Sequence, residues 1–203
     1  MSKIIAIMLL LCCGMMLFGC ADDNGRRKAE QQKTIVVTDS VGRKVELPYP
    51  LERVAVCNVY NAELITAVGA IDKIVGVDNY IFKDQSGFKN RFNEAQVFGI
   101  SQNAMNYEKL AELAPQAVII TGEGTWRDAQ EMLDRFGIKV IVVNSYYTDQ
   151  FADNCRLVGR IFGREEQAEE LVRYFTDKLE YIQSQLKDVP RKSLYFEYRT
   201  LGK

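Results

Sequence analysis

The sequence contains no histidine. Histidine is the commonest acid–base group near neutral pH, the commonest ligand of transition metals, and the usual partner of a serine or cysteine nucleophile. Its absence counts against a hydrolase built on a Ser-His or Cys-His pair. It also counts against direct capture of Zn²⁺ or Mn²⁺, because sites for these ions depend heavily on imidazole.

The chain also lacks an excess of charge of either sign. Its 26 Lys and Arg residues nearly balance its 27 Asp and Glu residues, which leaves a formal net charge of −1. Nucleic-acid-binding domains carry a basic surface, so the composition predicts no nucleic-acid partner. Because 47% of the 203 residues are hydrophobic, we expect one well-formed core, with room for the start of a second domain.

Cysteine is scarce beyond the first twenty residues, where only Cys57 and Cys155 remain. The two thiols could pair in an oxidising compartment, but two separately buried thiols are the favoured interpretation. Neither has a further soft ligand close by in the sequence, so no metal site is expected. A resident cofactor is not expected either, because the Gly122-x-Gly124 sequence lacks the other residues of a phosphate loop.

The first twenty residues have the pattern of a targeting segment. Lys3 supplies a positive charge, and Ile4 to Phe18 is an apolar run. The segment ends in Leu17-Phe18-Gly19-Cys20, which resembles the bacterial lipobox. That resemblance implies a signal peptide over residues 1–19 and a lipid on Cys20, which would anchor the protein to a bacterial membrane, facing the periplasm or the cell exterior. An ordinary signal peptide or anchor helix with an incidental cysteine is the alternative.

Residues 20–33 are polar and of mixed charge, and we interpret them as a lipidated flexible tether. Thr34 to Leu47 follows as a predicted β-hairpin, with its turn at Ser40-Val41-Gly42. Short apolar runs then alternate with helical patterns. Strands are predicted at 54–57, 74–77, 117–121 and 138–143, and helices at 62–68, 106–114 and 125–136.

This alternation predicts an α/β fold, a Rossmann-like lobe with a parallel sheet and flanking helices over residues 34–163. Asn106 is the expected N-cap of its helix, and Pro115 ends that helix. Thr125 with Asp128 suggests a helix start similar to a capping box. Residues 78–103 show no clear period and are expected to form a long, irregular connection, and loops of that length in a compact domain are often functional.

The C-terminal part of the chain is predicted to be mostly helical. A helix over 148–162 ends at Gly163, and a longer one covers 164–188, about 36 Å at the usual rise per residue. Its predicted buried face comprises Ala168, Leu171, Val172, Phe175, Leu179, Ile182 and Leu186. Lys192 to Arg199 then has the pattern of a new strand, so residues 189–203 are interpreted as the start of a second, truncated lobe.

Several segments together resemble one known family. Thr38 to Pro48 is similar to its opening pattern TD-x-x-GR-x-V-x-LP. Arg53 to Val56, Gly76 to Tyr80, and Asn106 to Ile119 follow in the family's order and spacing. From Thr34 to Arg199 the chain resembles the bacterial ABC-transporter substrate-binding lipoproteins for iron–siderophore, heme and cobalamin.

This resemblance implies two α/β lobes joined by one long rigid helix, with the ligand held between them. The chain is similar to the first lobe, the bridging helix and a short part of the second lobe. The implied function is capture of an iron chelate (siderophore or heme) or cobalamin and its delivery to an ABC permease, with no enzymatic activity. One alternative is a truncated paralogue without ligand binding, or one that retains only permease docking. The other is a flavodoxin-like enzyme, which no nucleophile–base arrangement or cofactor fingerprint favours.

The resemblance also suggests roles for single residues. Glu108 matches a carboxylate that docks on an arginine of the permease; alternatively, it only complements the positive end of its helix. Tyr80 matches a position that faces the ligand.

The loops that follow the four parallel strands are expected to converge on one edge of the sheet, where open α/β sheets bind ligands. Their aromatic faces would suit a flat or chelate-bearing ligand, and an arginine could pair with an anionic chelate. Packing at the loop bases is the alternative for each aromatic residue taken alone. The candidate ligand-binding residues are Asn58, Tyr60, Asn61, Tyr80, Gly122, Trp126, Arg127 and Tyr146.

Overall fold

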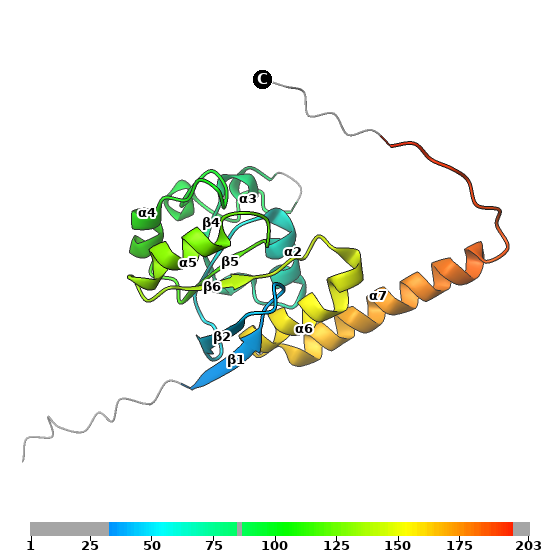
Figure 1. The fold of residues 1–203 in the computed structure, drawn as a ribbon, viewed down its shortest axis with the longest axis horizontal. Helices are drawn as coiled ribbons and strands as arrows, with labels where there is room; N and C mark the ends of the chain where they lie inside the picture. The colour runs from blue at the N-terminus through cyan, green and yellow to red at the C-terminus, as the bar shows by residue number, and fades with distance from the viewer. Residues whose placement is uncertain (1–32, 85–86, 197–203) are drawn as a thin grey trace, which may run out of the picture. The chain divides into compact units, whose positions relative to one another are not determined.

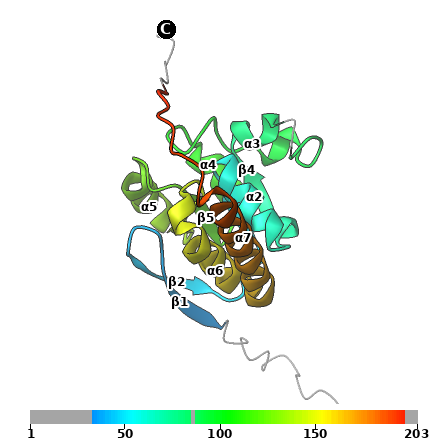
Figure 2. The ribbon, with the colours of Figure 1, turned by 90° about the vertical axis from the view of Figure 1, so that its right-hand side faces the viewer.

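A computed structural model describes residues 33–84 and 87–196 of the protein (Figures 1 and 2). The predicted signal peptide, Cys20 and almost all of the tether lie outside the described residues. Within those residues, no helix is both long enough and apolar enough to span a membrane.

The four core strands form one parallel sheet in the order β4-β3-β5-β6. Alternate residues of β3, β5 and β6 enter two separate apolar clusters: Val54 and Ile119 belong to one, and Ala55 and Val118 to the other. In β4, Ile74 and Val77 belong to the first cluster, and Gly76 lies against Phe98 of the second. Each strand is therefore buried on both faces, which explains the continuous apolar runs in the sequence. The predicted α/β fold is confirmed. The strands are β3 (Val54–Val56), β4 (Ile74–Val77), β5 (Ala117–Ile120) and β6 (Lys139–Val142).

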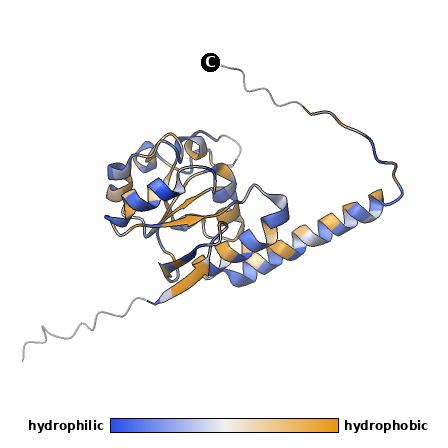
Figure 3. Ribbon diagram, in the orientation of Figure 1, coloured by the Kyte–Doolittle hydropathy of each residue, from blue (hydrophilic) through white to orange (hydrophobic). Residues whose placement is uncertain are grey.

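Helices cover both faces of this sheet. Helices α2 (Val59–Ala67) and α6 (Phe151–Phe162) contribute to one apolar cluster, and α4 (Tyr107–Glu112) and α5 (Trp126–Asp134) to the other. The strands are coloured as hydrophobic, whereas the helices also carry hydrophilic residues (Figure 3). Short 3-10 helices lie at Ile71–Lys73, Glu94–Gln96 and Thr148–Gln150.

The predicted N-terminal hairpin is confirmed as β1 (Thr34–Thr38) paired with β2 (Lys44–Pro48). Asp39 in its turn is 4% exposed and joins the hairpin to the sheet. Its carboxylate accepts hydrogen bonds from the backbone N–H of Val41 and Arg43, from the Arg43 guanidinium, and from the N–H of Val142 on β6. The Arg43 Nη2–Asp39 Oδ2 distance is 2.6 Å.

Two predictions of local structure within the α/β lobe were wrong. Residues 78–103 are not wholly irregular, because α3 (Asn79–Lys83) begins directly after β4, with the Asp78 carboxylate accepting a hydrogen bond from Ile81 N. A helix of five residues is too short to show a period in the sequence. Thr125 precedes α5 but forms no capping box, because its hydroxyl contacts the carbonyl of Gln102 and the side chain of Asn103 instead. The predicted N-cap at Asn106 is confirmed, because its side-chain oxygen accepts a hydrogen bond from Lys109 N.

The predicted long helix is present as α7 (Glu165–Leu186), but its apolar face is buried only near its start. Ala168 and Val172 are buried against α6, whereas Leu179, Ile182 and Leu186 are 41%, 49% and 55% exposed. The part of the expected strand that the structure describes, residues 192–196, forms no strand. A strand requires hydrogen bonds to a neighbour, and none of the described strands pairs with this segment.

Cys57 and Cys155 are both free and buried, which confirms the interpretation as two separate thiols. Burial raises the pKa of each thiol, that of Cys155 to about 12. Both side chains are therefore protonated near neutral pH and act as small apolar core residues.

Candidate functional site

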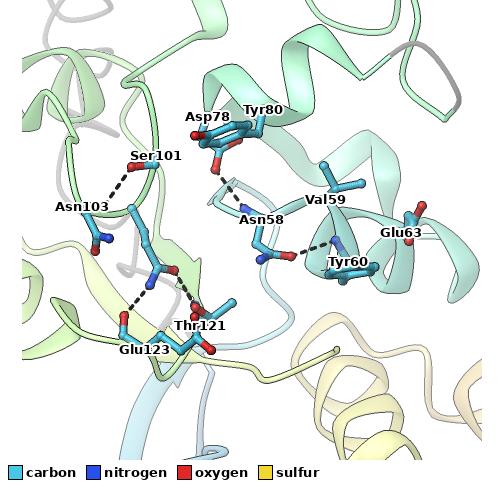
Figure 4. Close-up of a pocket in the computed structure, with 11 residues that line it drawn as sticks. Asn58, Val59, Tyr60, Glu63, Asp78, Tyr80, Ser101, Asn103, Thr121 and Glu123 are labelled. Carbon is cyan, nitrogen blue, oxygen red and sulfur yellow. Dashed lines mark hydrogen bonds between the residues drawn. The ribbon is translucent and has the colours of Figure 1, made fainter. Parts of the chain in front are cut away.

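A cavity of about 670 Å³ opens at the carboxyl ends of β3, β4 and β5 (Figure 4). This is the edge at which open parallel sheets bind ligands. Its walls come from the start of α2, the start of α3, the loop at 101–103 and the loop after β5. The lining residues are Asn58, Val59, Tyr60, Glu63, Asp78, Tyr80, Ser101, Gln102, Asn103, Thr121 and Glu123.

Asp78 joins the start of α2 to the start of α3. Its carboxylate accepts hydrogen bonds from the backbone N–H of Asn58 at 2.9 Å and of Ile81 at 3.0 Å. Asn58 has a φ of 77°, in the left-handed region, and its side chain accepts a bond from Tyr60 N. Burial raises the pKa of Asp78, although the bonds from Ile81, Asn58 and Tyr80 act in the opposite direction. The two loops are therefore held in a fixed relation by one buried carboxylate.

Gln102 joins the loop at 101–103 to the loop after β5. Its side-chain oxygen accepts hydrogen bonds from both the N–H and the hydroxyl of Thr121, at 2.9 and 2.8 Å. Its side-chain nitrogen donates to the carbonyl of Glu123 at 2.6 Å. Because these contacts span about twenty residues of sequence, no local pattern could have identified Gln102 as part of the site.

Three of the predicted ligand-binding residues line the cavity. Asn58, Tyr60 and Tyr80 come from the ends of two neighbouring strands, as expected (Figure 4). The two tyrosines are 55% and 62% exposed, so their rings are accessible to a ligand at the mouth of the cavity.

Two further predicted residues lie next to the cavity without lining it. Tyr146 donates a hydrogen bond to Glu123 Oε1 at 2.9 Å and packs on Tyr147 with ring centroids 4.2 Å apart. Burial is the main cause that raises the pKa of Tyr146, followed by its hydrogen bonds. Gly122 N donates to Asn144 Oδ1 at 2.7 Å. Both residues support the loop that carries Glu123.

The remaining predicted residues lie outside the cavity lining. Asn61 is 1% exposed. Its side-chain nitrogen donates a hydrogen bond to the carbonyl of Cys57, and its side-chain oxygen accepts one from the hydroxyl of Ser145. The Trp126 ring packs on the apolar cluster under α5. The guanidinium groups of Arg43 and Arg127 lie 4.3 and 4.1 Å from its centroid. These positions favour the packing alternative for Trp126 and place neither Asn61 nor Arg127 in the cavity lining.

The sequence reasoning missed several lining residues, among them Asp78, Gln102, Glu63 and Glu123. Asp78 carried a usable signal, since it is the first polar residue after an apolar strand. Glu63 lies one turn beyond Tyr60 on the exposed side of α2. In the described part of the chain, no group of three or more Cys, Asp or Glu side chains is placed to hold a metal ion.

Glu108 lies in the first turn of α4, away from the cavity lining. Its side chain is exposed and makes no hydrogen bond or ion pair with any described residue. Its neighbour Lys109 pairs instead with Glu112, at 3.4 Å.

The sequence profile of the periplasmic binding protein family matches residues 54–199. The chain belongs to this family. Its members are periplasmic binding proteins rather than enzymes, so the enzyme alternative is set aside.

Solved structures share the fold of this periplasmic binding protein chain. A solute-binding protein from Veillonella parvula is 24% identical with a TM-score of 0.66, over 79% of this chain and 50% of its own. The petrobactin-binding protein YclQ from Bacillus subtilis is 16% identical with a TM-score of 0.65, over 77% and 55%. The molybdate-binding protein MolA of Haemophilus influenzae is 21% identical with a TM-score of 0.65, over 77% and 55%. The chain thus spans about half the length of the structures it matches.

Proposed function

We propose that this chain forms the first lobe and bridging helix of a membrane-anchored, extracytoplasmic receptor that captures an iron chelate (siderophore or heme) or cobalamin and delivers it to an ABC import permease. Residues 34–163 are the lobe, 164–188 the helix and 189–203 the start of a second lobe. The observation that carries the proposal is the cavity of about 670 Å³ at the carboxyl ends of three parallel strands.

The size and construction of the cavity support this role. Its volume falls in the range of about 300–1,000 Å³ that is typical of small-molecule sites. Asp78 and Gln102 fix the four walls before any ligand arrives, which lowers the entropic cost of binding. Tyr60 and Tyr80 offer flat aromatic faces at the mouth, which suit a bulky chelate or macrocycle. In a two-lobed receptor this cavity would be one wall of the ligand site.

Ultraviolet–visible titration of the purified full chain with heme, cobalamin and a series of ferric chelates tests the proposal. We expect saturable binding of at least one of these ligands. Tyr80→Ala should weaken that binding, whereas Tyr174→Ala, which removes an equally exposed tyrosine from α7, should not. If none of the ligands binds, the truncated-paralogue alternative is favoured over the receptor.

Two further parts of the proposal each rest on one residue. Cys20 as the lipid attachment site predicts that Cys20→Ala moves the protein from the membrane fraction to the soluble fraction of the cell envelope. The exposed carboxylate of Glu108 supports its assignment as the permease contact, because a docking side chain has to be accessible and unpaired.

A further inference from the structure

Every formally charged side chain on the cavity wall is negative. The lining includes Glu63, Asp78 and Glu123, and it includes neither lysine nor arginine. Figure 4 shows the three carboxyl groups on three different walls, after β3, β4 and β5. The negative charge is therefore distributed around the cavity rather than concentrated at one point.

The two glutamates have no cationic partner in the described residues. The Glu123 carboxylate accepts one hydrogen bond, from the neutral hydroxyl of Tyr146, and Glu63 forms no hydrogen bond or ion pair there. Asp78 differs, because backbone N–H groups surround its carboxylate. Glu63 and Glu123 are thus the groups that leave a net negative field in the cavity.

The arginine expected to recognise an anionic chelate is engaged elsewhere. Arg127 stacks on Trp126, and Arg43 covers the same ring while binding Asp39. The cavity instead presents the open rings of Tyr60 and Tyr80. Tyrosine rings attract cations through the negative potential of their faces, so the aromatic and the acidic groups favour the same sign of ligand charge.

We infer that this cavity selects ligands that are neutral or positively charged and disfavours polyanionic ones. The inference rests on the proposed receptor function and narrows its ligand class. Ferric chelates of hydroxamate type, which carry no surplus negative charge, fit this field, and so do corrinoids without net negative charge. Heme with its two carboxylates, and ferric chelates of catecholate or citrate type, do not fit it.

The test keeps the chelate constant and changes only its charge. The probes are ferric complexes of one linear trihydroxamate with a terminal amine. The free amine gives a net charge of plus one, its acetylated form zero and its succinylated form minus one. Equilibrium dialysis against the full chain, read by the visible absorbance of the complex, gives the three dissociation constants. We expect affinity to fall roughly three- to tenfold for each unit of positive charge removed, and less in about 1 M salt, where charges are screened.

A double variant locates the origin of the preference. Glu63→Gln combined with Glu123→Gln should flatten the ranking of the three probes, because both changes remove charge and leave shape nearly unchanged. Glu170→Gln on α7 is the matched control, since Glu170 is exposed and does not line the cavity. The control should preserve the ranking. Circular dichroism confirms that both variants are folded.

The outcomes separate the inference from the proposed function. Equal affinity for all three probes, or tighter binding of the succinylated one, overturns the charge preference and leaves the receptor function standing. A preference that survives the double variant overturns the assignment to Glu63 and Glu123. Failure of every probe to bind overturns the hydroxamate ligand class, and failure of heme and cobalamin as well overturns the receptor function itself.

Discussion

Two buried aspartates each tie separate segments of this molecule together, and they do so differently. Asp39 in the hairpin turn is matched by a cation, the Arg43 guanidinium, in addition to backbone N–H groups. Asp78 at the cavity is matched by backbone N–H groups alone. An ion pair of fixed geometry neutralises the first region, whereas the second stays negative. The contrast separates a turn held by an ion pair from a cavity wall held by backbone hydrogen bonds, beside which Glu63 and Glu123 keep exposed negative charge.

The largest expected effect comes from breaking the charged pair. Asp39→Asn removes the charge from an acceptor of several hydrogen bonds and leaves the partly buried Arg43 without its anion. We expect the free energy of unfolding to fall by about 2–4 kcal/mol. Urea denaturation measures this change, with Asp177→Asn on the exposed side of α7 as a control expected to stay within about 0.5 kcal/mol. A loss no larger than that of the control would contradict the role given to Asp39.

A smaller effect is expected at Asp78, whose carboxylate is matched by backbone N–H groups and by no cationic side chain of the described residues. Asp78→Asn keeps one acceptor oxygen but leaves a backbone N–H without its partner, which costs about 1–2 kcal/mol of stability. A comparable loss at Asp39 and Asp78 under the same conditions would remove the contrast between the two regions.

Asp78 should also give a distinctive pH dependence. Burial raises the pKa of Asp78 above its usual 3.8 in the folded protein, so the folded state holds its proton more tightly than the unfolded state. Stability from this group is fully present below the unfolded pKa and is lost as the pH rises through the folded pKa. The destabilisation by Asp78→Asn should therefore be larger near pH 3 than at pH 7, measured by urea denaturation at each pH. A larger destabilisation at pH 7 would contradict the raised pKa.

A change at the cavity is expected to affect ligand binding rather than stability. Tyr80→Ala removes an aromatic face that is 62% exposed. We expect about a tenfold loss of affinity for the ligand, equivalent to about 1.4 kcal/mol, with stability nearly unchanged. The titration described above measures affinity, and thermal unfolding measures stability. An equal loss in Tyr174→Ala would show that the effect is not specific to the cavity.

Glu108 is expected to contribute little to stability and nothing to ligand affinity. Its carboxylate complements the positive end of α4, so Glu108→Ala should lower stability by about 0.3–0.5 kcal/mol. Ligand affinity should not change, whereas uptake of the ligand by cells should fall. Glu131→Ala on α5 is the control for uptake. Loss of affinity in Glu108→Ala would show that this residue belongs to the ligand site and not to a permease contact.

The elements of the fold that have a period or a cap were predictable from the sequence. The hairpin, the four parallel strands and the cap at Asn106 follow from apolar runs and from Asn or Gly at the expected positions. The strand predicted after Pro190 was wrong over residues 192–196 because strand propensity does not supply a pairing partner. The helix α3 was missed because a side chain from the preceding strand end, Asp78, defines its start.

A site residue was predictable where its position in a helix determines the direction of its side chain. Tyr60 and Tyr80 start helices at strand ends and face the cavity. Asn61 falls on the buried face of α2, beside Ala62, Leu64 and Ile65. Trp126 shares the i, i+3, i+7 stripe of α5 with Ala129 and Leu133, so its helical phase already indicated packing. Gln102 acts through contacts that only the folded chain brings together.

The left-handed backbone of Asn58 has a consequence for redesign of this cavity. At a φ of 77° only glycine, and to a lesser extent asparagine or aspartate, fits without strain, and Asp78 holds that conformation in place. These two positions cannot be diversified without losing the shape of the cavity. A library that aims at a new ligand should therefore keep both fixed and vary Tyr60 and Glu63, whose side chains are exposed and form no hydrogen bond with any described residue.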